Sequence, residues 1–272
     1  MKIAFSTLGC PQWDLDTIIA AAREYGYDGV DFRGLQGEMN ITKLPEFTDR
    51  AQETLVRFQA AGLEIPCFST GARMFNPDAK SRKASIQEVK KYAEVCRNFG
   101  TPMMRVFGGA TKGADPEAAV TTAAETLEEM ARVARGVTIG VETHDDWVDS
   151  SHLAKVFDRV GSANVCIIWD LHHPYQQAGE SPSTTFHNIG KFTQYCHVKN
   201  SKTDENGKNH LVGPTEGDVP LAQLIGLLRG SGYEGYLTLE WEKVWHPDIA
   251  EPEEIFPAYA DFLRRVIHSA GR

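Results

Sequence analysis

The chain has 272 residues, of which 42% are hydrophobic and 24% are charged, and its formal net charge is −9. These values are ordinary for a globular protein, and we expect residues 1–272 to form a single domain. An acidic chain disfavours nucleic acid as a partner, and no apolar run approaches the length of a membrane helix, so we expect no membrane contact either. Because the chain enters a strand-like segment at once, we predict no signal peptide and expect a cytoplasmic location.

Strand-like and helix-like segments alternate along the chain. Short apolar, β-branched or aromatic runs indicate buried parallel strands, and longer segments with helical periodicity indicate crossover helices. The eight predicted strands lie near residues 2–7, 28–33, 63–69, 103–107, 137–142, 164–170, 194–199 and 235–240. The eight predicted helices lie near residues 14–26, 46–61, 80–99, 115–135, 149–160, 184–191, 219–229 and 252–269. Eight βα units in a chain of this length predict an α/β fold, a single (β/α)8 TIM barrel.

The predicted helices begin and end at recurrent signals. Asp14 and Asp115 precede helical runs and suit N-cap positions. Glycines follow four of the helical runs, at positions 26, 62, 100 and 136. These glycines suit left-handed C-caps, and their recurrence indicates a repeated structural unit.

Polar side chains end the fifth to eighth predicted strands. The four segments are Val141-Glu142-Thr143-His144, Trp169-Asp170-Leu171-His172-His173, Cys196-His197-Val198-Lys199 and Leu239-Glu240-Trp241-Glu242. Because the carboxyl ends of barrel strands meet at one face, two glutamates, an aspartate and a histidine should converge there. Such a set suits Mn²⁺, Mg²⁺, Co²⁺ or Zn²⁺ better than a thiolate zinc site would, and burying it without a cation would be costly. We therefore predict one divalent metal ion, with Mn²⁺ as the first expectation.

Residues two positions apart in a strand share a face, which indicates other side chains at the same site. His144 should point the same way as Glu142, where a neutral imidazole suits a general acid or base; a hydrogen bond to a neighbouring strand is the alternative. Lys199 and Arg105 lie near strand ends and suit binding of a substrate carboxylate, hydroxyl or phosphate, or else ion pairs at the rim. Trp241 offers an aromatic wall for a sugar, although packing between barrel and helix is an equal alternative.

The segment from residue 202 to 220 is polar and contains three glycines. Its composition is that of a loop. It suits either a lid over the site or an ordinary solvated connection.

The four strand-end segments, in this order, resemble the xylose isomerase-like TIM-barrel superfamily, and the resemblance covers nearly the whole chain. It implies that one divalent metal is held by Glu142, Asp170, His197 and Glu240. It also implies that His173, three residues after Asp170, contacts the substrate; support of the metal ligands is the alternative. The expected partner is a small carbohydrate or a cyclitol-like molecule, and we also expect a homodimer.

A metal that chelates a carbonyl and an adjacent hydroxyl acidifies the hydrogen between them and stabilises an enediolate. The primary prediction is a sugar isomerase or epimerase, in which Glu142 and Glu240 exchange protons from opposite sides, as resemblance to the ketose 3-epimerases implies. The alternative is a lyase or dehydratase acting on a keto-cyclitol, a 3-keto-glycoside or a 3-dehydroshikimate-like substrate, with His144 as acid or base.

One departure from the epimerase pattern keeps both chemistries open. The epimerases often have a Glu-Pro-type motif, whereas Glu142-Thr143-His144 looks closer to the 3-dehydroshikimate dehydratase branch. An endonuclease IV-like nuclease is disfavoured because the additional histidines of a trinuclear zinc cluster are not found. A protein that binds a polyol without turnover is a further alternative.

Overall fold

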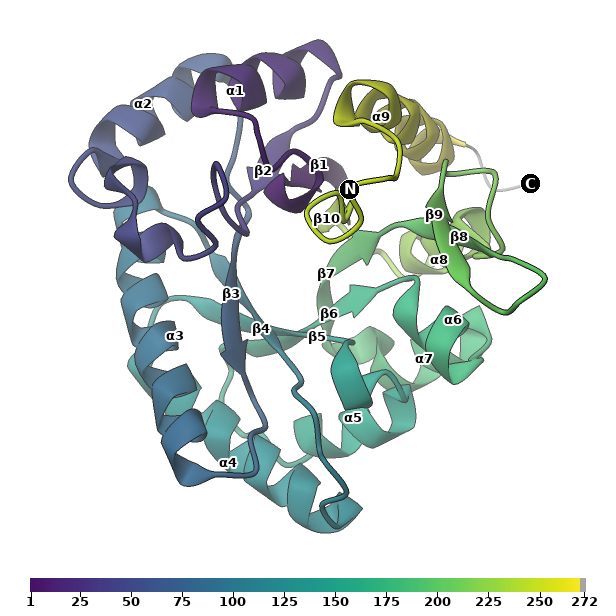
Figure 1. The fold of residues 1–272 in the computed structure, drawn as a ribbon. Helices are drawn as coiled ribbons and strands as arrows, with labels where there is room; N and C mark the ends of the chain where they lie inside the picture. Colours follow the sequence, from purple (N-terminus) through teal and green to yellow (C-terminus); the bar gives the residue numbers. More distant parts are fainter. Residues whose placement is uncertain (270–272) are drawn as a thin grey trace.

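The computed structural model describes residues 1–269, so the last three residues of the expected domain lie outside the described part. Eight parallel strands form a nearly closed barrel with helices around it (Figure 1). In sheet order the strands are β2 (Gly29–Asp31), β1 (Lys2–Ser6), β10 (Tyr236–Leu239), β7 (Thr193–Val198), β6 (Val165–Asp170), β5 (Thr138–Glu142), β4 (Met103–Phe107) and β3 (Cys67–Arg73). Bridges from Gly29 to Glu64 and from Phe32 to Phe68 join the two ends of the sheet. The predicted TIM barrel is confirmed.

The helices of the repeated unit follow the strands at the expected places. They are α1 (Leu15–Glu24), α2 (Ala51–Ala61), α3 (Ala79–Phe99), α4 (Pro116–Val133), α5 (Ser150–Phe157), α7 (Pro182–Ile189), α8 (Leu221–Gly230) and α9 (Pro252–His268). The shorter helices, five of them 3₁₀, are η1 (Thr7–Gly9), η2 (Ile41–Lys43), η3 (Pro45–Phe47), η4 (Asp145–Trp147), α6 (His173–Ala178) and η5 (Gly190–Phe192). Within residues 1–269, no helix is both long enough and apolar enough to cross a membrane.

The predicted helix boundary signals are confirmed. The side chains of Asp14 and Asp115 accept hydrogen bonds from the backbone N–H groups of Thr17 and Ala118, as N-caps do. The glycines at positions 26, 62, 100 and 136 have φ angles of 75°, 69°, 68° and 82°. A left-handed residue after each of these helices turns the chain back toward the next strand.

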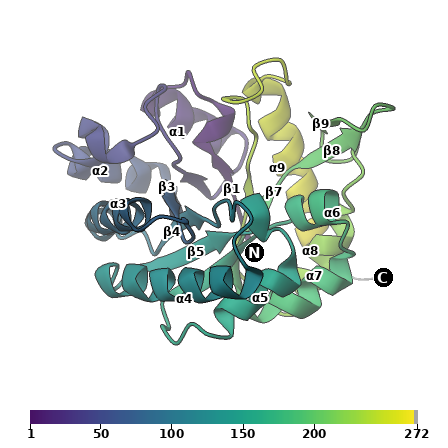
Figure 2. The same cartoon turned by 60° about the horizontal axis from the view of Figure 1, so that its bottom comes forward.

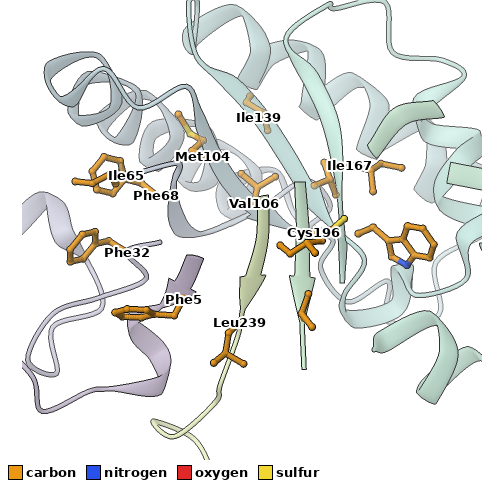
Figure 3. Packing of buried hydrophobic residues seen from close by; sticks show 14 of the residues in the cluster. Phe5, Phe32, Ile65, Phe68, Met104, Val106, Ile139, Ile167, Cys196 and Leu239 are labelled. Carbon is orange, nitrogen blue, oxygen red and sulfur yellow. The ribbon is translucent and has the colours of Figure 1, made fainter. Parts of the chain in front are cut away.

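Two apolar layers hold the barrel together. The larger one lies between strands and helices and includes Phe32, Phe68, Val106 and Leu239 (Figure 3). The smaller one consists of Cys67, Met103, Cys166, Ile168 and Tyr195. Its members alternate with the polar strand-end residues, as in Cys166, Ile168 and Asp170, so they share one strand face with them. The smaller cluster therefore fills the barrel interior beneath the candidate site.

The polar segment after β7 forms an antiparallel hairpin of β8 (Asn200–Thr203) and β9 (Asn209–Val212), which projects from the barrel beside α9 (Figure 1, Figure 2). The expectation of a loop throughout residues 202–220 is thus wrong. The turn explains the difference: Gly207 has a φ of 79°, and the Asp204 carboxylate accepts hydrogen bonds from the backbone N–H groups of Asn206 and Lys208. A connection of about 3–5 residues that contains glycine between two strand-like runs is a hairpin signal, and the sequence interpretation overlooked it.

Candidate active site

Four acidic or imidazole side chains gather at the C-terminal end of the barrel. Their ligand atoms all lie within 4.8 Å of one another, and the four residues are Glu142, Asp170, His197 and Glu240. Each of them is at most 4% exposed. The structure thus brings together the whole set of predicted metal ligands in a buried position.

The sheet register explains why these residues meet. Asp170 on β6 pairs directly with His197 on β7, and the backbone N–H of Glu240 donates to the carbonyl of Val198. Parallel strands with this register place their last inward-facing residues at the same height. The cluster is therefore built on strand backbone, which holds it more rigidly than loops would.

The imidazole of His197 presents its two nitrogens to different groups. Its Nδ1 lies 2.8 Å from Oε1 of Glu142 and 3.3 Å from Oε1 of Glu240. Its Nε2 makes no hydrogen bond to any residue in the range 1–269, and Oδ2 of Asp31 lies 3.7 Å away. One ring nitrogen thus faces two predicted ligands and the other faces the opposite side of the barrel.

Two buried cations lie against the predicted ligands. Nζ of Lys199 donates to the carboxylates of Asp170 and Glu240, the latter at 2.7 Å, and lies 3.1 Å from Glu242. Nε of Arg105 lies 3.3 Å from Oε2 of Glu142. Lys199 and Arg105 therefore form ion pairs inside the site, the alternative that the sequence left open. Their expected contact with substrate stays a prediction.

These charges fix the ionisation of the carboxylates. Burial alone would raise the pKa of Asp170, but the nearby His173 and the ammonium group of Lys199 outweigh it and lower that pKa. Burial likewise opposes ionisation of Glu240, yet Lys199 and His197 hold its pKa well below the ordinary value. The pKa of Lys199 is raised in spite of burial by the Asp170 and Glu240 carboxylates. The carboxylates are therefore ionised at neutral pH, as metal ligands must be.

The residues present fit a divalent cation. Oε2 of Glu142 is buried, and although Nε of Arg105 lies 3.3 Å away, this oxygen has no hydrogen-bond partner among the described residues, so its lone pairs are available to a cation. Three carboxylates and one imidazole form a mixed oxygen and nitrogen donor set, which suits Mn²⁺, Mg²⁺, Co²⁺ or Zn²⁺.

His144 lies at the rim of the site, with 34% of its side chain exposed. Its ring centroid is 4.9 Å from that of His173, and its Nδ1 lies 3.0 Å from Oδ1 of Asp145. Burial alone would lower the pKa of His144, but Asp145 and Glu142 outweigh it and raise that pKa. Within residues 1–269, Nδ1 of His144 makes no hydrogen bond to a neighbouring strand, so that alternative receives no support.

Asp145 escaped the sequence interpretation, although it directly follows His144. Its backbone has a φ of 56°, and its Oδ2 accepts a hydrogen bond of 2.9 Å from the N–H of Gly109. A non-glycine residue in the left-handed region is strained and needs fixed surroundings. The hydrogen bond from Gly109 holds the Asp145 carboxylate beside the His144 imidazole.

His173 begins α6 and supports Asp170. Its backbone N–H donates to Oδ1 of Asp170 at 3.0 Å, and its ring Nδ1 lies 2.9 Å from the carbonyl of Thr143. Burial lowers the pKa of His173, so the ring is neutral and donates from Nδ1 to that carbonyl. This geometry favours the supporting role; contact with substrate stays a prediction.

Trp241 packs away from the candidate site. It is fully buried, its indole N–H donates to the carbonyl of Ala250 at 3.0 Å, and its ring lies 6.1 Å from that of Tyr259 on α9. Because Glu240 faces the cluster, the next residue points to the other side of the strand. The expected substrate contact of Trp241 receives no support from this position, which is that of the packing alternative.

The sequence interpretation also missed Asp31, a buried carboxylate at the end of β2. Its Oδ1 accepts a hydrogen bond from Ser69 at 2.9 Å, and its Oδ2 accepts one from Tyr195 at 3.4 Å. Tyr195 in turn accepts from Thr238 at 2.6 Å. The sequence feature that could have indicated Asp31 is an acidic residue inside the predicted strand 28–33, on the same side as the strand-end residues.

A sequence model of the family described as xylose isomerase-like TIM barrel matches residues 19–266. No curated protein sequence matches the chain. A structure of the probable 3-DHS dehydratase AsbF from Bacillus anthracis is similar, with a TM-score of 0.80 and 18% identity over 97% of this chain and 99% of that one. So is the IOLI protein with a bound zinc atom, with a TM-score of 0.82 and 18% identity over 98% of each chain. The structure of the 3-keto-D-glucoside 4-epimerase YcjR from E. coli is also similar, with a TM-score of 0.73 and 16% identity over 98% of each chain. Identities this low establish a shared fold only.

Proposed function

Because the chain belongs to the xylose isomerase-like TIM-barrel family, we propose that it is a metal-dependent isomerase or epimerase of a small carbohydrate or cyclitol. The observation that carries this proposal is the buried cluster of four ligand groups at the C-terminal end of the barrel. TIM-barrel enzymes have their active sites at that end.

The residues that would hold the metal are Glu142, Asp170, His197 and Glu240. When bound there, a divalent cation supplies Lewis acidity that polarises a substrate carbonyl and acidifies the neighbouring C–H group. The IOLI structure contains zinc, which is compatible with the donor set of this chain. Mn²⁺ stays the first expectation from the sequence, and the homodimer and the cytoplasmic location stay predictions as well.

The chain's own carboxylates are suited to move the proton. Glu142 lies on β5 and Glu240 follows β10, so two other strands separate them in the sheet. Carboxylates on separate strands suit removal of a proton from one side of a substrate and its return from the other. This arrangement supports the proposal of an epimerisation or isomerisation.

A specific observation favours a lyase as the second candidate. His144 is outside the ligand cluster, is partly exposed and has a carboxylate beside its Nδ1. Its Nε2 can take the proton next to a substrate carbonyl, while the electron pair forms a C=C bond and a hydroxyl group on the next carbon leaves as water after protonation. One of the similar structures is that of a probable 3-DHS dehydratase.

Proton NMR of the Mg²⁺-loaded protein in D₂O separates these functions. The substrates to test are ketoses, inososes, 3-keto-glycosides and 3-dehydroshikimate. Deuterium entering beside the carbonyl, with a new isomer or epimer and no alkene, supports the isomerase. An enone or aromatic product overturns it in favour of the lyase. If the metal-loaded protein forms neither an isomer or epimer nor an enone or aromatic product from any of these substrates, the result counts against both the isomerase and the lyase.

Three variants assign the roles. Glu142→Gln should lose both metal and turnover while staying folded, and full retention of both would overturn the site. His144→Asn should keep its metal; it should retain proton exchange in an isomerase and lose turnover in a lyase. His187→Asn is the matched control, because His187 lies exposed on α7 and should leave every readout unchanged.

A further inference from the structure

Asp31 is a fully buried carboxylate on the inner face of the barrel. Within residues 1–269, His197 is the one basic side chain within 4.0 Å of it, with Nε2 3.7 Å from Oδ2. A carboxylate removed from water needs a positive or hydrogen-bonding partner. The hydroxyls of Ser69 and Tyr195 supply two, and the imidazole is the remaining polar group that faces it.

The position of the proton on the His197 ring determines which nitrogen can bind a metal. A neutral imidazole carries one proton, so the nitrogen that binds a metal must be the other one. Nδ1 faces two predicted ligands, at 2.8 Å from Glu142 and 3.3 Å from Glu240. Metal binding through Nδ1 therefore requires the proton to stay on Nε2, the nitrogen that faces Asp31.

We propose that Asp31 is a positioning residue that keeps the proton of His197 on Nε2 and so presents Nδ1 to the metal. This inference rests on the metal site of the proposed function. Hydrogen bonds from other strands hold the Asp31 carboxylate in position. Ser69 on β3 donates to one oxygen, and Tyr195 on β7, itself bonded to Thr238 on β10, approaches the other.

The distance of 3.7 Å between Nε2 of His197 and Oδ2 of Asp31 is longer than a hydrogen bond. The carboxylate attracts the N–H dipole electrostatically across the barrel interior, without a hydrogen bond of ordinary length. Outer partners of this kind, carboxylates beside a metal-binding histidine, typically contribute 10–100-fold to metal affinity.

The test is the metal affinity of Asp31→Asn, a change that keeps the size of the side chain and removes its charge. The dissociation constant for Zn²⁺ is measured by competition with a chromophoric chelator. We expect binding to weaken about 10–100-fold. Asp28→Asn is the matched control, since Asp28 lies three residues earlier at the outer surface beside Arg264 and should bind Zn²⁺ like the original protein.

A second readout observes the proton directly. In ¹⁵N-histidine NMR of the Zn²⁺-loaded protein, His197 should show its proton on Nε2 and its metal on Nδ1. A proton on Nδ1, or an Asp31→Asn affinity equal to that of the original protein, would overturn the inference. If Asp31→Asn does not fold, Ser69→Ala replaces it as the test variant, alongside the NMR experiment. Ser69→Ala removes a hydrogen bond to Asp31 and should weaken Zn²⁺ binding several-fold. Failure of the original protein to bind any divalent metal would instead overturn the proposed function.

Discussion

Replacing Lys199 by methionine tests how the candidate site is held together. The side chain is fully buried, and its ammonium group contacts the carboxylates of Asp170, Glu240 and Glu242. Methionine fills a similar volume without the charge. The substitution therefore leaves three carboxylates close together, two of them almost completely buried, with no ammonium group between them.

The magnitude follows from the burial of the pair. Removing one partner of a buried ion pair costs about 3–5 kcal/mol, because the remaining charge stays uncompensated. For a chain of this size, each kcal/mol lowers Tm by about 2–4 °C, so Lys199→Met should melt about 6–20 °C below the original protein. A divalent cation restores positive charge to the same carboxylates and binds only the folded state. Saturating Mg²⁺ should therefore recover a large part of the loss.

Differential scanning calorimetry in EDTA and in excess Mg²⁺ provides the assay. Lys191→Met is the control, since Lys191 makes an exposed pair of 3.3 Å with Asp158 and should leave Tm unchanged. If Lys199→Met melts within about 2 °C of the original protein in EDTA, less than the shift from 1 kcal/mol, the ammonium group does not stabilise the buried carboxylates. A Tm loss that is the same in EDTA and Mg²⁺ would refute the sharing of these carboxylates with a metal.

Two further changes test the barrel interior and the position of Trp241. A Cβ on Gly140 would lie 2.5 Å and 2.6 Å from two side-chain carbons of Ile168, so Gly140→Ala should lower stability by about 1–3 kcal/mol in denaturant unfolding; an unchanged midpoint would show that the interior has room. Trp241→Phe removes the hydrogen bond to the Ala250 carbonyl and should destabilise the fold by about 1 kcal/mol while leaving the KM unchanged. A raised KM with an unchanged Tm would place the indole against the substrate instead.

The barrel could be predicted because the information for it is local. Buried parallel strands are short apolar runs, and each of the recurrent glycines closes a helix at the same point of the repeat. The ligand cluster could be predicted for the same reason, since the end of each strand is visible in the sequence and the fold brings these ends together. Glu142 and Asp170 needed no tertiary detail beyond the barrel itself.

Contacts across the barrel could not be predicted in the same way. Alternation indicated that Lys199 shares a face with His197, but its choice of Asp170 and Glu240 depends on distances between three strands. Asp31 meets His197 only because β2 and β7 lie across the interior from one another. Trp241 is a different case, since the alternation that placed Glu240 at the site already implied the opposite face for its neighbour.

The balance of charge in the site bears on the substrate. Five carboxylates and two cations lie there, namely Asp31, Glu142, Asp170, Glu240, Glu242, Lys199 and Arg105. The excess of three negative charges is one more than a divalent cation neutralises. A negatively charged substrate would add to this remaining charge, so the cluster favours a neutral sugar over an anionic one. A carboxylated substrate would instead need a cation outside the cluster; Arg33, whose pKa is lowered to about 10 by burial and by Arg105, is the half-buried candidate near this end of the barrel.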